Sequence, residues 1–562
     1  MQEEIRKAIE AVLTELGIAD VEFVVEHPGD VTHGDYATNV AMVIAKKLGK
    51  NPREVGDELR IALEGKIQYV SAITIAGPGF INFRLHRDFF KEKIAGILTR
   101  PDAWGRNDSW KGKKVLVEYT DPNPFKEFHV GHLFTNTVGE SVARLFMLNG
   151  AEVKCLNYGS DIGLHVAHAL WGMKELGIDV SSDFTSRDLG RAYAHGATAY
   201  KNEDPRAMQE IREINKGIYE GSTNEFSVLY EKGRAVSIAY FKEMYALLGS
   251  EFDAQFFESE VASPGKALVL AHPELFPLSD GAHVFKGEEY GLHTRVFLNK
   301  EGLPTYEAKE LALAKMKEER LGSYDLSVVS TANEINEYFK VLRKAMSFIY
   351  PELAEKTEHI GHGTVRLTSG KMSSRTGNVI PAIDFIDEVA DAAAAKMDEG
   401  GKIAPTEELA RDIALGAIKY ATLRGSIFQD SVFDKEKALS FEGDSGPYLQ
   451  YTHARIVSVL DKAQEVGVTP NAQVGPVEAY AIEKILYRFE EVVAEALHER
   501  APHKVAVYIT ELAGAFNAFY GEEKIADAGD TYAPYKAAIA EAVRATLKNG
   551  LYALGIKAPD RM

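Results

Sequence analysis

The chain has 562 residues, of which 45% are hydrophobic and 26% are charged, which excludes a disordered chain and predicts a folded protein of several domains. Its formal net charge of −19 argues only weakly against nucleic acid, because a local basic groove can lie on an acidic protein. The single cysteine, Cys155, excludes an internal disulfide and a cluster of thiolates around zinc. The apolar runs are too short for a bilayer and no signal peptide is recognised, which predicts a cytoplasmic chain without a membrane partner.

Residues 1–105 are predicted to form an α+β unit. The first 18 residues have the pattern of an amphipathic helix, residues 34–49 that of a second helix, and residues 70–85 that of two strands joined at Gly77-Pro78-Gly79. The stretch 99–113 is rich in helix-breaking and charged residues, which predicts a linker.

Residues 112–385 are predicted to form an α/β domain with a Rossmann-like parallel sheet. Strand-like and helical patterns alternate here, and a long helical stretch of about residues 166–250 interrupts them as an insertion. The predicted strands are 114–119, 152–158, 296–299 and 326–330, and the predicted helices are 133–149 and 306–320.

The remainder of the chain is predicted to be helical, with no strands after about Ala382. We divide it into a connecting region, 386–440, and an all-α domain, 441–562. Apolar residues recur within 477–498 at close to a helical period, which predicts one helix of a bundle there.

His129 and His132 lie at the predicted junction of strand 114–119 and helix 133–149. A helix that follows a strand turns its unpaired N–H groups and its positive end toward the turn, where a triphosphate can bind. Histidines three positions apart share one face of the helix, and Gly131 lets an adenine ring approach the backbone. The alternative is a pair of satisfied polar residues at a helix start.

A second motif lies far downstream, between Gly370 and Gly377. Two cations and two hydroxyls on a loop with glycine hinges can close over a triphosphate; the motif residues are Lys371, Met372, Ser373, Ser374 and Arg375. A basic surface loop is the alternative for this segment alone, but together with His129 and His132 it predicts an ATP site.

Two other histidine pairs are not expected to be functional. His359 and His362 frame an Ile-Gly pair but lack a following helix, which predicts a strand bearing at most on the adenine side of the site. His165 and His168 have no neighbour at metal-ligand spacing, so no metal site is predicted there.

Both motifs resemble those of class I aminoacyl-tRNA synthetases, and their flanks resemble the arginyl-tRNA synthetase family. The similar stretches follow the family's order over nearly the whole chain: GDYATNVAMVIAKKLGK, GPGFINF, VEYTDPNPFKEFHVGHL, GLPTYEAKELALAK, GKMSSRTGNVI, GPYLQYTHARI and LGIKAPDRM. The resemblance implies a Rossmann-like catalytic domain, an N-terminal domain that contacts tRNA and a C-terminal anticodon-binding bundle.

The resemblance also implies roles for residues at matching positions. Arginine would be bound by Glu118, Asn123, Tyr306, Glu310 and Asn333; ATP by Lys126, His129, Gly131, His132, Lys371, Met372, Ser373 and Ser374; and the catalytic residues would be His129, His132, Lys371 and Arg375. The chain departs from the family at Glu310, where aspartate is usual, at Phe134, where arginine is common, and near Asn333, where the register is ambiguous by one.

Arginine as substrate agrees with the chemistry of these residues. A planar guanidinium with five donors requires carboxylates at matching spacing, which Glu118 and Glu310 can supply. Leaving such a buried carboxylate unpaired costs about 3–5 kcal/mol, so lysine or citrulline would be rejected without an editing domain.

The implied reaction is an arginine–tRNA ligase reaction in two steps. Arginine attacks the α-phosphorus of ATP, which brings Mg²⁺, and the adenylate is then transferred to the 2′-hydroxyl of the terminal adenosine of tRNA(Arg); the family generally requires bound tRNA for the first step. The expected tRNA-binding residues are Asn82, Phe83, Tyr448, Gln450, Tyr451 and Arg455, with core packing as the alternative for each tyrosine. The expected partners are tRNA(Arg), ATP and L-arginine, without DNA.

Two rival functions remain open at this point. A small-molecule adenylyltransferase would share the histidine motif but would leave over half of the chain unexplained. A catalytically silent paralogue that binds tRNA or arginine would be difficult to reconcile with the joint presence of His129, His132 and Lys371.

Overall fold

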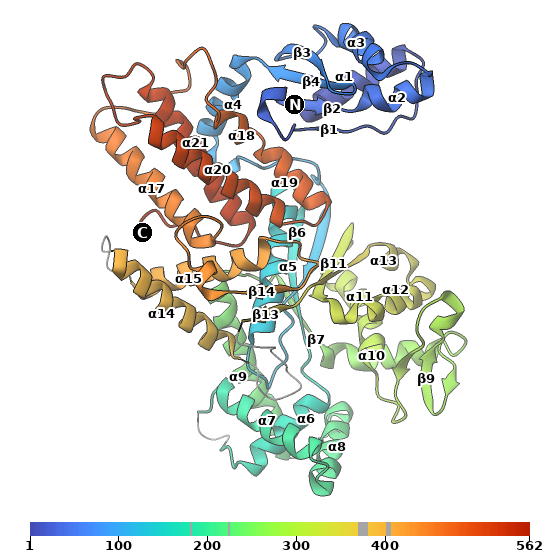
Figure 1. Ribbon diagram of the computed structural model, residues 1–562. Helices are drawn as coiled ribbons and strands as arrows, with labels where there is room; N and C mark the ends of the chain where they lie inside the picture. Colours follow the sequence, from blue (N-terminus) through green and yellow to red (C-terminus); the bar gives the residue numbers. More distant parts are fainter. Residues whose placement is uncertain (180–182, 223–224, 369–379, 401–405) are drawn as a thin grey trace. The chain divides into compact units, whose positions relative to one another are not determined.

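The computed structural model describes residues 1–179, 183–222, 225–368, 380–400 and 406–562. The chain forms two compact units, which are coloured along the sequence in Figure 1. The first comprises Met1–Gly105, Arg455–Val492 and Glu511–Asn549, and the second comprises Arg106–Ala454, Val493–Thr510 and Gly550–Met562. Each unit is described separately below.

The first unit contains a four-stranded antiparallel sheet in the order β1-β2-β4-β3. Its strands are β1 (Val25–Glu26), β2 (Tyr36–Thr38), β3 (Val70–Ala76) and β4 (Phe80–Leu85), and its helices include α1 (Gln2–Glu15), α2 (Val40–Leu48), α3 (Pro52–Leu63) and α4 (Arg87–Thr99). The predicted first helix and the β3–β4 hairpin are confirmed. The predicted helix over 34–49 is correct only from Val40, because Tyr36–Thr38 pairs with β4 as a strand.

The prediction of one helix over 477–498 is wrong. The structure has two shorter helices, α18 (Glu483–Leu486) and α19 (Phe489–His498), and Val477 is 89% exposed. The buried Glu483 explains the late start: its carboxylate accepts hydrogen bonds from the Tyr480 N–H at 2.9 Å, from Arg87 at 2.7 Å and from Tyr535 at 2.5 Å. These contacts fix the chain in a turn before Glu483.

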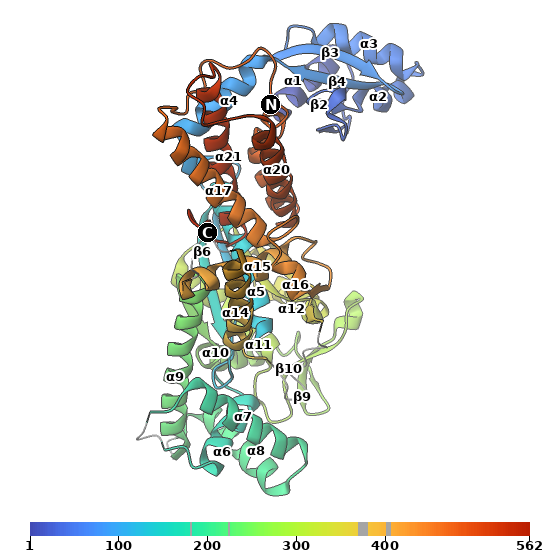
Figure 2. The ribbon, with the colours of Figure 1, turned by 60° about the vertical axis from the view of Figure 1, so that its left-hand side comes forward.

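The second unit is built on a five-stranded parallel sheet in the order β12-β11-β5-β6-β7, with the strand that precedes the histidine motif at its centre. Figure 2 gives a second view of this unit, with β6 and α5 labelled. The strands are β5 (Lys114–Glu118), β6 (Glu152–Gly159), β7 (Ala254–Phe257), β11 (Leu326–Ala332) and β12 (Thr357–His362). Helices α5 (Val130–Leu148), α10 (Glu258–Ala271), α11 (Tyr306–Leu321), α12 (Asn336–Ile349) and α13 (Pro351–Glu355) connect or follow them. The predicted α/β class with a Rossmann-like sheet is confirmed.

The predicted helical insertion lies between β6 and β7. It consists of α6 (Leu164–Glu175), α7 (Ser186–Lys201), α8 (Pro205–Glu220) and α9 (Glu225–Leu248). The predicted strand 296–299 exists as β10 (Arg295–Leu298), but it belongs to a separate antiparallel sheet with β8 (Leu278–Ser279) and β9 (Ala282–Phe285) rather than to the parallel sheet.

The helices that follow the sheet are α14 (Ala382–Gly400), α15 (Glu407–Leu423), α16 (Lys435–Ala438), α17 (Gly446–Glu465), α20 (His503–Glu522) and α21 (Ala533–Ala553). The expectation of no strand after Ala382 is wrong at one place, because β14 (Ser431–Phe433) pairs in parallel with β13 (Val365–Leu367).

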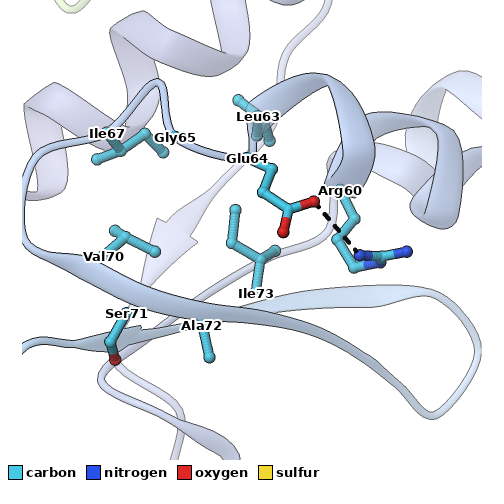
Figure 3. A pocket seen from close by; sticks show the side chains of 9 residues that line it. All are labelled: Arg60, Leu63, Glu64, Gly65, Ile67, Val70, Ser71, Ala72 and Ile73. Atoms are coloured by element: carbon cyan, nitrogen blue, oxygen red, sulfur yellow. Dashed lines mark ion pairs between the residues drawn. The ribbon is translucent and has the colours of Figure 1, made fainter.

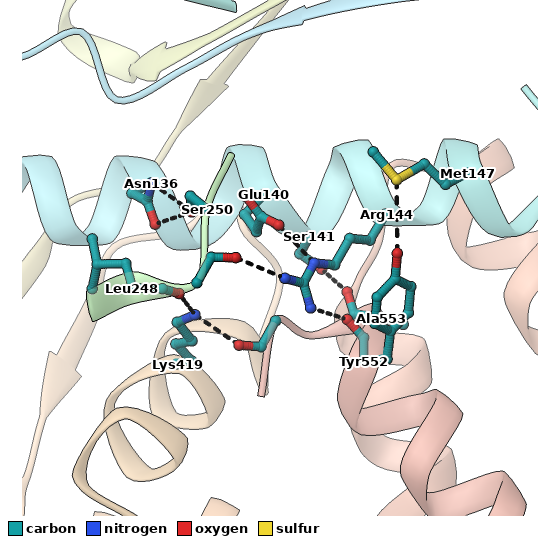
Figure 4. A network of polar contacts seen from close by, with 12 residues as sticks. Asn136, Glu140, Ser141, Arg144, Met147, Leu248, Ser250, Lys419, Tyr552 and Ala553 are labelled. Atoms are coloured by element: carbon teal, nitrogen blue, oxygen red, sulfur yellow. Dashed lines mark hydrogen bonds and ion pairs between the residues drawn. The ribbon is translucent and has the colours of Figure 1, made fainter. Parts of the chain in front are cut away.

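Helix α5 is fixed in the second unit by a polar network with the C-terminal tail (Figure 4). Arg144 pairs with Glu140 at 2.6 Å and donates to the carbonyl oxygens of Tyr552 at 3.0 Å and Gly249 at 3.1 Å. The buried Lys419 of α15 donates to the carbonyl oxygens of Leu248 at 2.6 Å and Gly555 at 2.7 Å. The network therefore holds the helix that begins at the histidine motif.

Candidate active site

The loop from β5 to α5 has a strained backbone. Thr120, Asp121 and Phe125 all have positive φ, at 79°, 43° and 66°, a conformation that side chains other than glycine rarely adopt. Tertiary contacts hold it there, since Asn136 donates to the Thr120 hydroxyl at 2.9 Å and the Phe125 N–H donates to the Ser237 hydroxyl at 2.9 Å. Strain of this kind is typical of functional loops.

His129 and His132 lie together at the start of α5. Their rings stack with centroids 3.7 Å apart and an interplanar angle of 17°. His129 is the N-cap residue, and its backbone N–H donates to Nδ1 of His132 at 3.2 Å. A Cβ added at Gly131 would lie 2.9 Å from the His129 ring, so the stacked arrangement requires glycine between the two histidines.

Both imidazoles are neutral at pH 7. Burial lowers the pKa of His129 to about 4, with the charge of Lys126 contributing, and burial lowers the pKa of His132 well below its usual value. Because Nδ1 of His132 accepts a hydrogen bond, its single proton lies on Nε2. His132 therefore presents an N–H donor at the positive end of a helix, where an anion is favoured.

The backbone around His129 also pairs with the segment that follows residues 369–379. The Val130 N–H donates to the Ile380 carbonyl at 3.2 Å, and the Ala382 N–H donates to the Phe128 carbonyl at 2.8 Å. Ile380 and Leu367 both pack on the hydrophobic cluster that includes Val130. The described residues that flank segment 369–379 in the sequence thus contact the start of α5.

A cavity of about 280 Å³ opens at the C-terminal ends of β5, β6 and β11, the edge at which open α/β sheets bind ligands. Its lining includes side chains from those strands and from α11 and α12: Glu118, Asp121, Tyr158, Arg295, Tyr306, Glu307, Glu310, Val329, Thr331, Ile335, Tyr338 and Phe339. Three of the five expected arginine-binding residues, Glu118, Tyr306 and Glu310, are among them.

The cavity contains more buried acid than base. Glu118 pairs with the buried Lys317 at 2.8 Å, and Glu307 pairs with Arg295 at 3.3 Å. Neither Asp121 nor Glu310 has a cationic partner among the described residues. Burial and the nearby Glu118 charge raise the pKa of Glu310 to about 8, and the same two causes raise the pKa of Asp121 well above its usual value.

Two tyrosine hydroxyls in the cavity wall support a polar ligand. Tyr158 and Tyr338 are 8% and 7% exposed, and within the described part of the chain neither hydroxyl has a hydrogen-bond partner. Buried polar atoms without partners are rare in folded proteins, and a ligand group satisfies such atoms. The cavity is therefore suited to a small cation with several N–H donors.

A second hollow, in the first unit, is too small for such a ligand. It has about 70 Å³ and lies beside Arg60, Glu64 and Ile73 (Figure 3). Arg60 and Glu64 pair with each other across 3.9 Å. No helix in the described ranges is long and apolar enough to cross a bilayer.

Comparison with known proteins gives three matching family models. Residues 93–435 match the catalytic domain of class I tRNA synthetases (R), residues 1–85 match the arginyl-tRNA synthetase N-terminal domain, and residues 449–562 match the DALR anticodon-binding domain. The chain is 30% identical over 581 residues to an arginine–tRNA ligase of Clostridium kluyveri, covering 100% of this chain and 99% of that protein. The chain belongs to the arginyl-tRNA synthetases.

Other relatives of this synthetase agree. It is 30% identical over 569 residues to an arginine–tRNA ligase of Clostridium acetobutylicum, covering 99% of this chain and 100% of that protein. The arginyl-tRNA synthetase of Thermus thermophilus superposes with a TM-score of 0.83 at 28% identity, covering 100% of both chains. The enzyme from Plasmodium falciparum, with a TM-score of 0.78 at 18% identity and covering 100% and 99% of the two chains, shares the fold.

The other expected active-site residues of the synthetase are distributed unevenly. Asn123 and Asn333 do not line the cavity; near Asn333 the lining residues are Thr331 and Ile335. Lys126 lies 4.5 Å from the centre of the Tyr193 ring and close enough to His129 and His132 to lower their pKa values. Lys371, Met372, Ser373, Ser374 and Arg375 lie outside the described residues.

The histidine pair of β12 has a structural role. The strand predicted there is confirmed, and its His359 ring stacks on Phe339 with centroids 3.9 Å apart and bonds to the Thr331 hydroxyl at 2.7 Å. A Cβ at Gly361 would lie 1.7 Å from Oδ1 of Asn336, so this glycine is required by packing. His359 thus packs against two residues of the cavity wall, Phe339 and Thr331, whereas the buried His362 bonds to the Thr135 hydroxyl at 3.1 Å.

Several residues expected to touch tRNA are buried. Phe83 is fully buried in the core of the first unit and Asn82 is 4% exposed. Gln450 is fully buried and donates to the carbonyl oxygens of Asp412 at 3.2 Å and Lys557 at 3.0 Å. In this structure the three side chains are therefore covered by the protein, and their contact with tRNA stays a prediction.

Of the remaining tRNA candidates, Arg455 is exposed and lies 5.2 Å from the centre of the Tyr520 ring, while Tyr448 and Tyr451 are half-buried. Arg455 is therefore the most accessible of the expected tRNA contacts.

Sequence reasoning missed Asp121, Tyr158, Tyr338 and Lys317. One signal for Lys317 was available, because Tyr306, Glu310 and Lys317 recur at spacings that place them on one face of a helix. Asp121 had the position of an acid just beyond a buried strand, in an unusual loop with two prolines.

Proposed function

We propose that the chain activates L-arginine with ATP and transfers it to the 3′-terminal adenosine of tRNA(Arg), releasing AMP and pyrophosphate. The observation that carries the proposal is the cavity of buried carboxylates at the C-terminal edge of the sheet. The loop that leads from this edge to the stacked histidines contributes Asp121 to the cavity lining. An acidic cavity of this size suits a guanidinium, whose five donors can satisfy both carboxylates and tyrosine hydroxyls.

In the proposed activation step, Glu118 and Glu310 hold the guanidinium and Tyr306 flanks it. The substrate carboxylate attacks the α-phosphorus in line and pyrophosphate leaves. His132 donates from Nε2 to phosphate oxygens, and the neutral His129 ring stacks on His132 and offers a further ring N–H. Lys126 adds positive potential, and Lys371 and Arg375 neutralise the leaving pyrophosphate. Magnesium enters with ATP as part of the substrate and neutralises phosphate charge. Positioning and electrostatics provide most of the rate enhancement.

The C-terminal helical region is proposed to bind the anticodon, with Arg455, Tyr448 and Tyr451 as candidate contacts. Bases of single-stranded RNA stack on aromatic rings and on guanidinium planes. The phosphate contacts of tRNA make its affinity fall steeply with added salt, and a flat response between about 50 and 200 mM would contradict this assignment.

The test is arginine-dependent exchange of pyrophosphate into ATP, measured with and without tRNA(Arg). The proposal predicts exchange that requires arginine and increases with tRNA. Exchange that does not require arginine but requires another small acid indicates an adenylyltransferase of another class. Absence of exchange, with tRNA binding retained, indicates a catalytically silent paralogue.

A further inference from the structure

The cavity holds one more carboxylate than a guanidinium site requires. Asp121 lines it together with Glu118 and Glu310. Its Oδ1 accepts hydrogen bonds from the Tyr158 N–H at 2.7 Å and from Asn157 at 3.4 Å. Among the described residues, no hydrogen bond reaches Oδ2, and the unpartnered Tyr158 hydroxyl lines the same cavity.

The carboxyl groups of the cavity outnumber the cations that pair with them among the described residues. The carboxylates of Glu118, Asp121 and Glu310 face one resident cation, Lys317, which pairs with Glu118. The other acids nearby have their own partners, since Glu307 pairs with Arg295 and Glu258 pairs with Lys309. Among the described residues, Asp121 and Glu310 therefore have no cation to pair with, and a buried carboxyl group ionises readily only when a cation compensates its charge. Arginine has two cationic ends, the guanidinium and the α-ammonium.

The positions of Glu310, Glu118 and Asp121 indicate which cationic end of arginine each of them binds. Glu310 and Glu118 are close enough for the Glu118 charge to be the largest electrostatic influence on Glu310. Asp121 lies past the end of β5, on the segment that continues to His129. The α-ammonium is separated by one carbon from the carboxylate that must meet the α-phosphate near His129, so this end of the substrate belongs on the Asp121 side.

Resting on the proposed function, we infer that Asp121 binds the α-ammonium group of the substrate arginine, while Glu310 and Glu118 bind its guanidinium. Asp121 is thus a specificity-determining residue for a free α-amino acid. Asp121 lines the cavity at a positive φ of 43°, and the hydrogen bond from the Tyr158 N–H fixes the orientation of its carboxylate.

The test replaces Asp121 by residues that tolerate positive φ. Asp121→Asn keeps an acceptor for the Tyr158 N–H, Asp121→Gly removes the side chain, and both types occur readily at positive φ. Glu388→Gln is the matched control, because it removes a carboxylate charge of the same unit that lies outside the cavity and pairs with Lys435. Thermal unfolding confirms that each variant is folded.

Each variant is assayed by aminoacylation of tRNA(Arg), which gives KM and kcat for arginine, and by inhibition constants of two analogues. L-Citrulline keeps the α-ammonium but lacks the guanidinium charge, and 5-guanidinopentanoate keeps the guanidinium but lacks the α-amino group. For both Asp121 variants we expect KM for arginine and Ki for citrulline to rise at least tenfold. Ki for 5-guanidinopentanoate should change less than threefold, as should all constants of Glu388→Gln.

Three results would overturn the inference. Unchanged KM for arginine shows that Asp121 makes no contact, equal losses for both analogues show a structural effect, and selective loss for 5-guanidinopentanoate places Asp121 at the guanidinium. A wild-type chain that fails to charge tRNA with arginine contradicts the proposed function itself, which this design separates from the role of Asp121.

Discussion

The backbone N–H of Val130 donates a hydrogen bond of 3.2 Å to the carbonyl oxygen of Ile380. Val130 is the first residue of α5, and Ile380 is the first described residue after the segment that contains Lys371. Leu367, just before that segment, packs on the same hydrophobic cluster as Val130 and Ile380. The described residues on both sides of segment 369–379 therefore contact the fold at the start of α5, which supports the proposal that both motifs serve one nucleotide.

His132→Ala should slow arginine-dependent pyrophosphate exchange by about 10²–10³-fold, because removing one donor to a developing oxyanion typically has that effect. Affinity for tRNA should change little, since the imidazole faces phosphate. The control is His272→Ala, which removes a ring that, within the described residues, bonds to the Leu268 carbonyl at 2.9 Å. Equal losses of exchange and tRNA binding would contradict the assignment.

Arginine binding should release protons near pH 7. Burial raises the pKa of Glu310 to about 8, so its carboxyl is mostly protonated in the free protein and must ionise to pair with a guanidinium. KM for arginine should therefore fall as the pH rises from 6.5 to 8.5, and calorimetric enthalpies should differ between phosphate and Tris buffers. Glu310→Gln should remove most of this pH dependence. A wild-type KM that does not change with pH would refute the prediction that Glu310 loses a proton when arginine binds.

The same raised pKa makes a stability prediction. The folded state binds the Glu310 proton more tightly than the unfolded state, so the free energy of unfolding of the ligand-free chain should fall as the pH rises from about 4.5 through about 8. Glu310→Gln should therefore unfold at higher denaturant than the wild type above pH 8. Glu118→Gln should instead lose about 3–5 kcal/mol, because it leaves Lys317 buried without its partner. Similar effects of the two substitutions would contradict the charge assignment.

Lys419→Met should destabilise the chain by about 1–3 kcal/mol, because the carbonyl oxygens of Leu248 and Gly555 lose their donor. Burial lowers the pKa of Lys419 to about 7, so its contribution should decline as the pH falls from 10.5 toward 7. Chemical denaturation measures the loss. Lys435→Met, which removes a half-exposed ion pair with Glu388, should cost less than about 1 kcal/mol.

The fold was largely predictable because its signals are local. A buried apolar strand followed by a helix is visible at β5 and α5, and alternation with helices indicates the parallel sheet. The helix predicted over 477–498 failed because periodicity does not register Glu483, whose buried contacts to Arg87 and Tyr535 come from distant segments.

The site was predictable only in part, because several of its contacts join segments that are distant in the sequence. Glu118 and Glu310 follow from motif positions, but the pairing of Glu118 with Lys317 depends on how α11 packs against β5. Asp121 lines the cavity at a positive φ, a backbone conformation that the residue types of this loop do not predict. Gln450 resembles a polar surface residue in sequence, yet it is buried against the C-terminal tail.

A structure of the chain with tRNA(Arg) and a non-hydrolysable arginyl-adenylate analogue tests the central claim most directly. The account predicts the guanidinium between Glu118 and Glu310, and the phosphate within hydrogen-bond distance of both His132 Nε2 and the Lys371 ammonium. An analogue bound with its phosphate away from His132, or with Lys371 on a different face from α5, would contradict it.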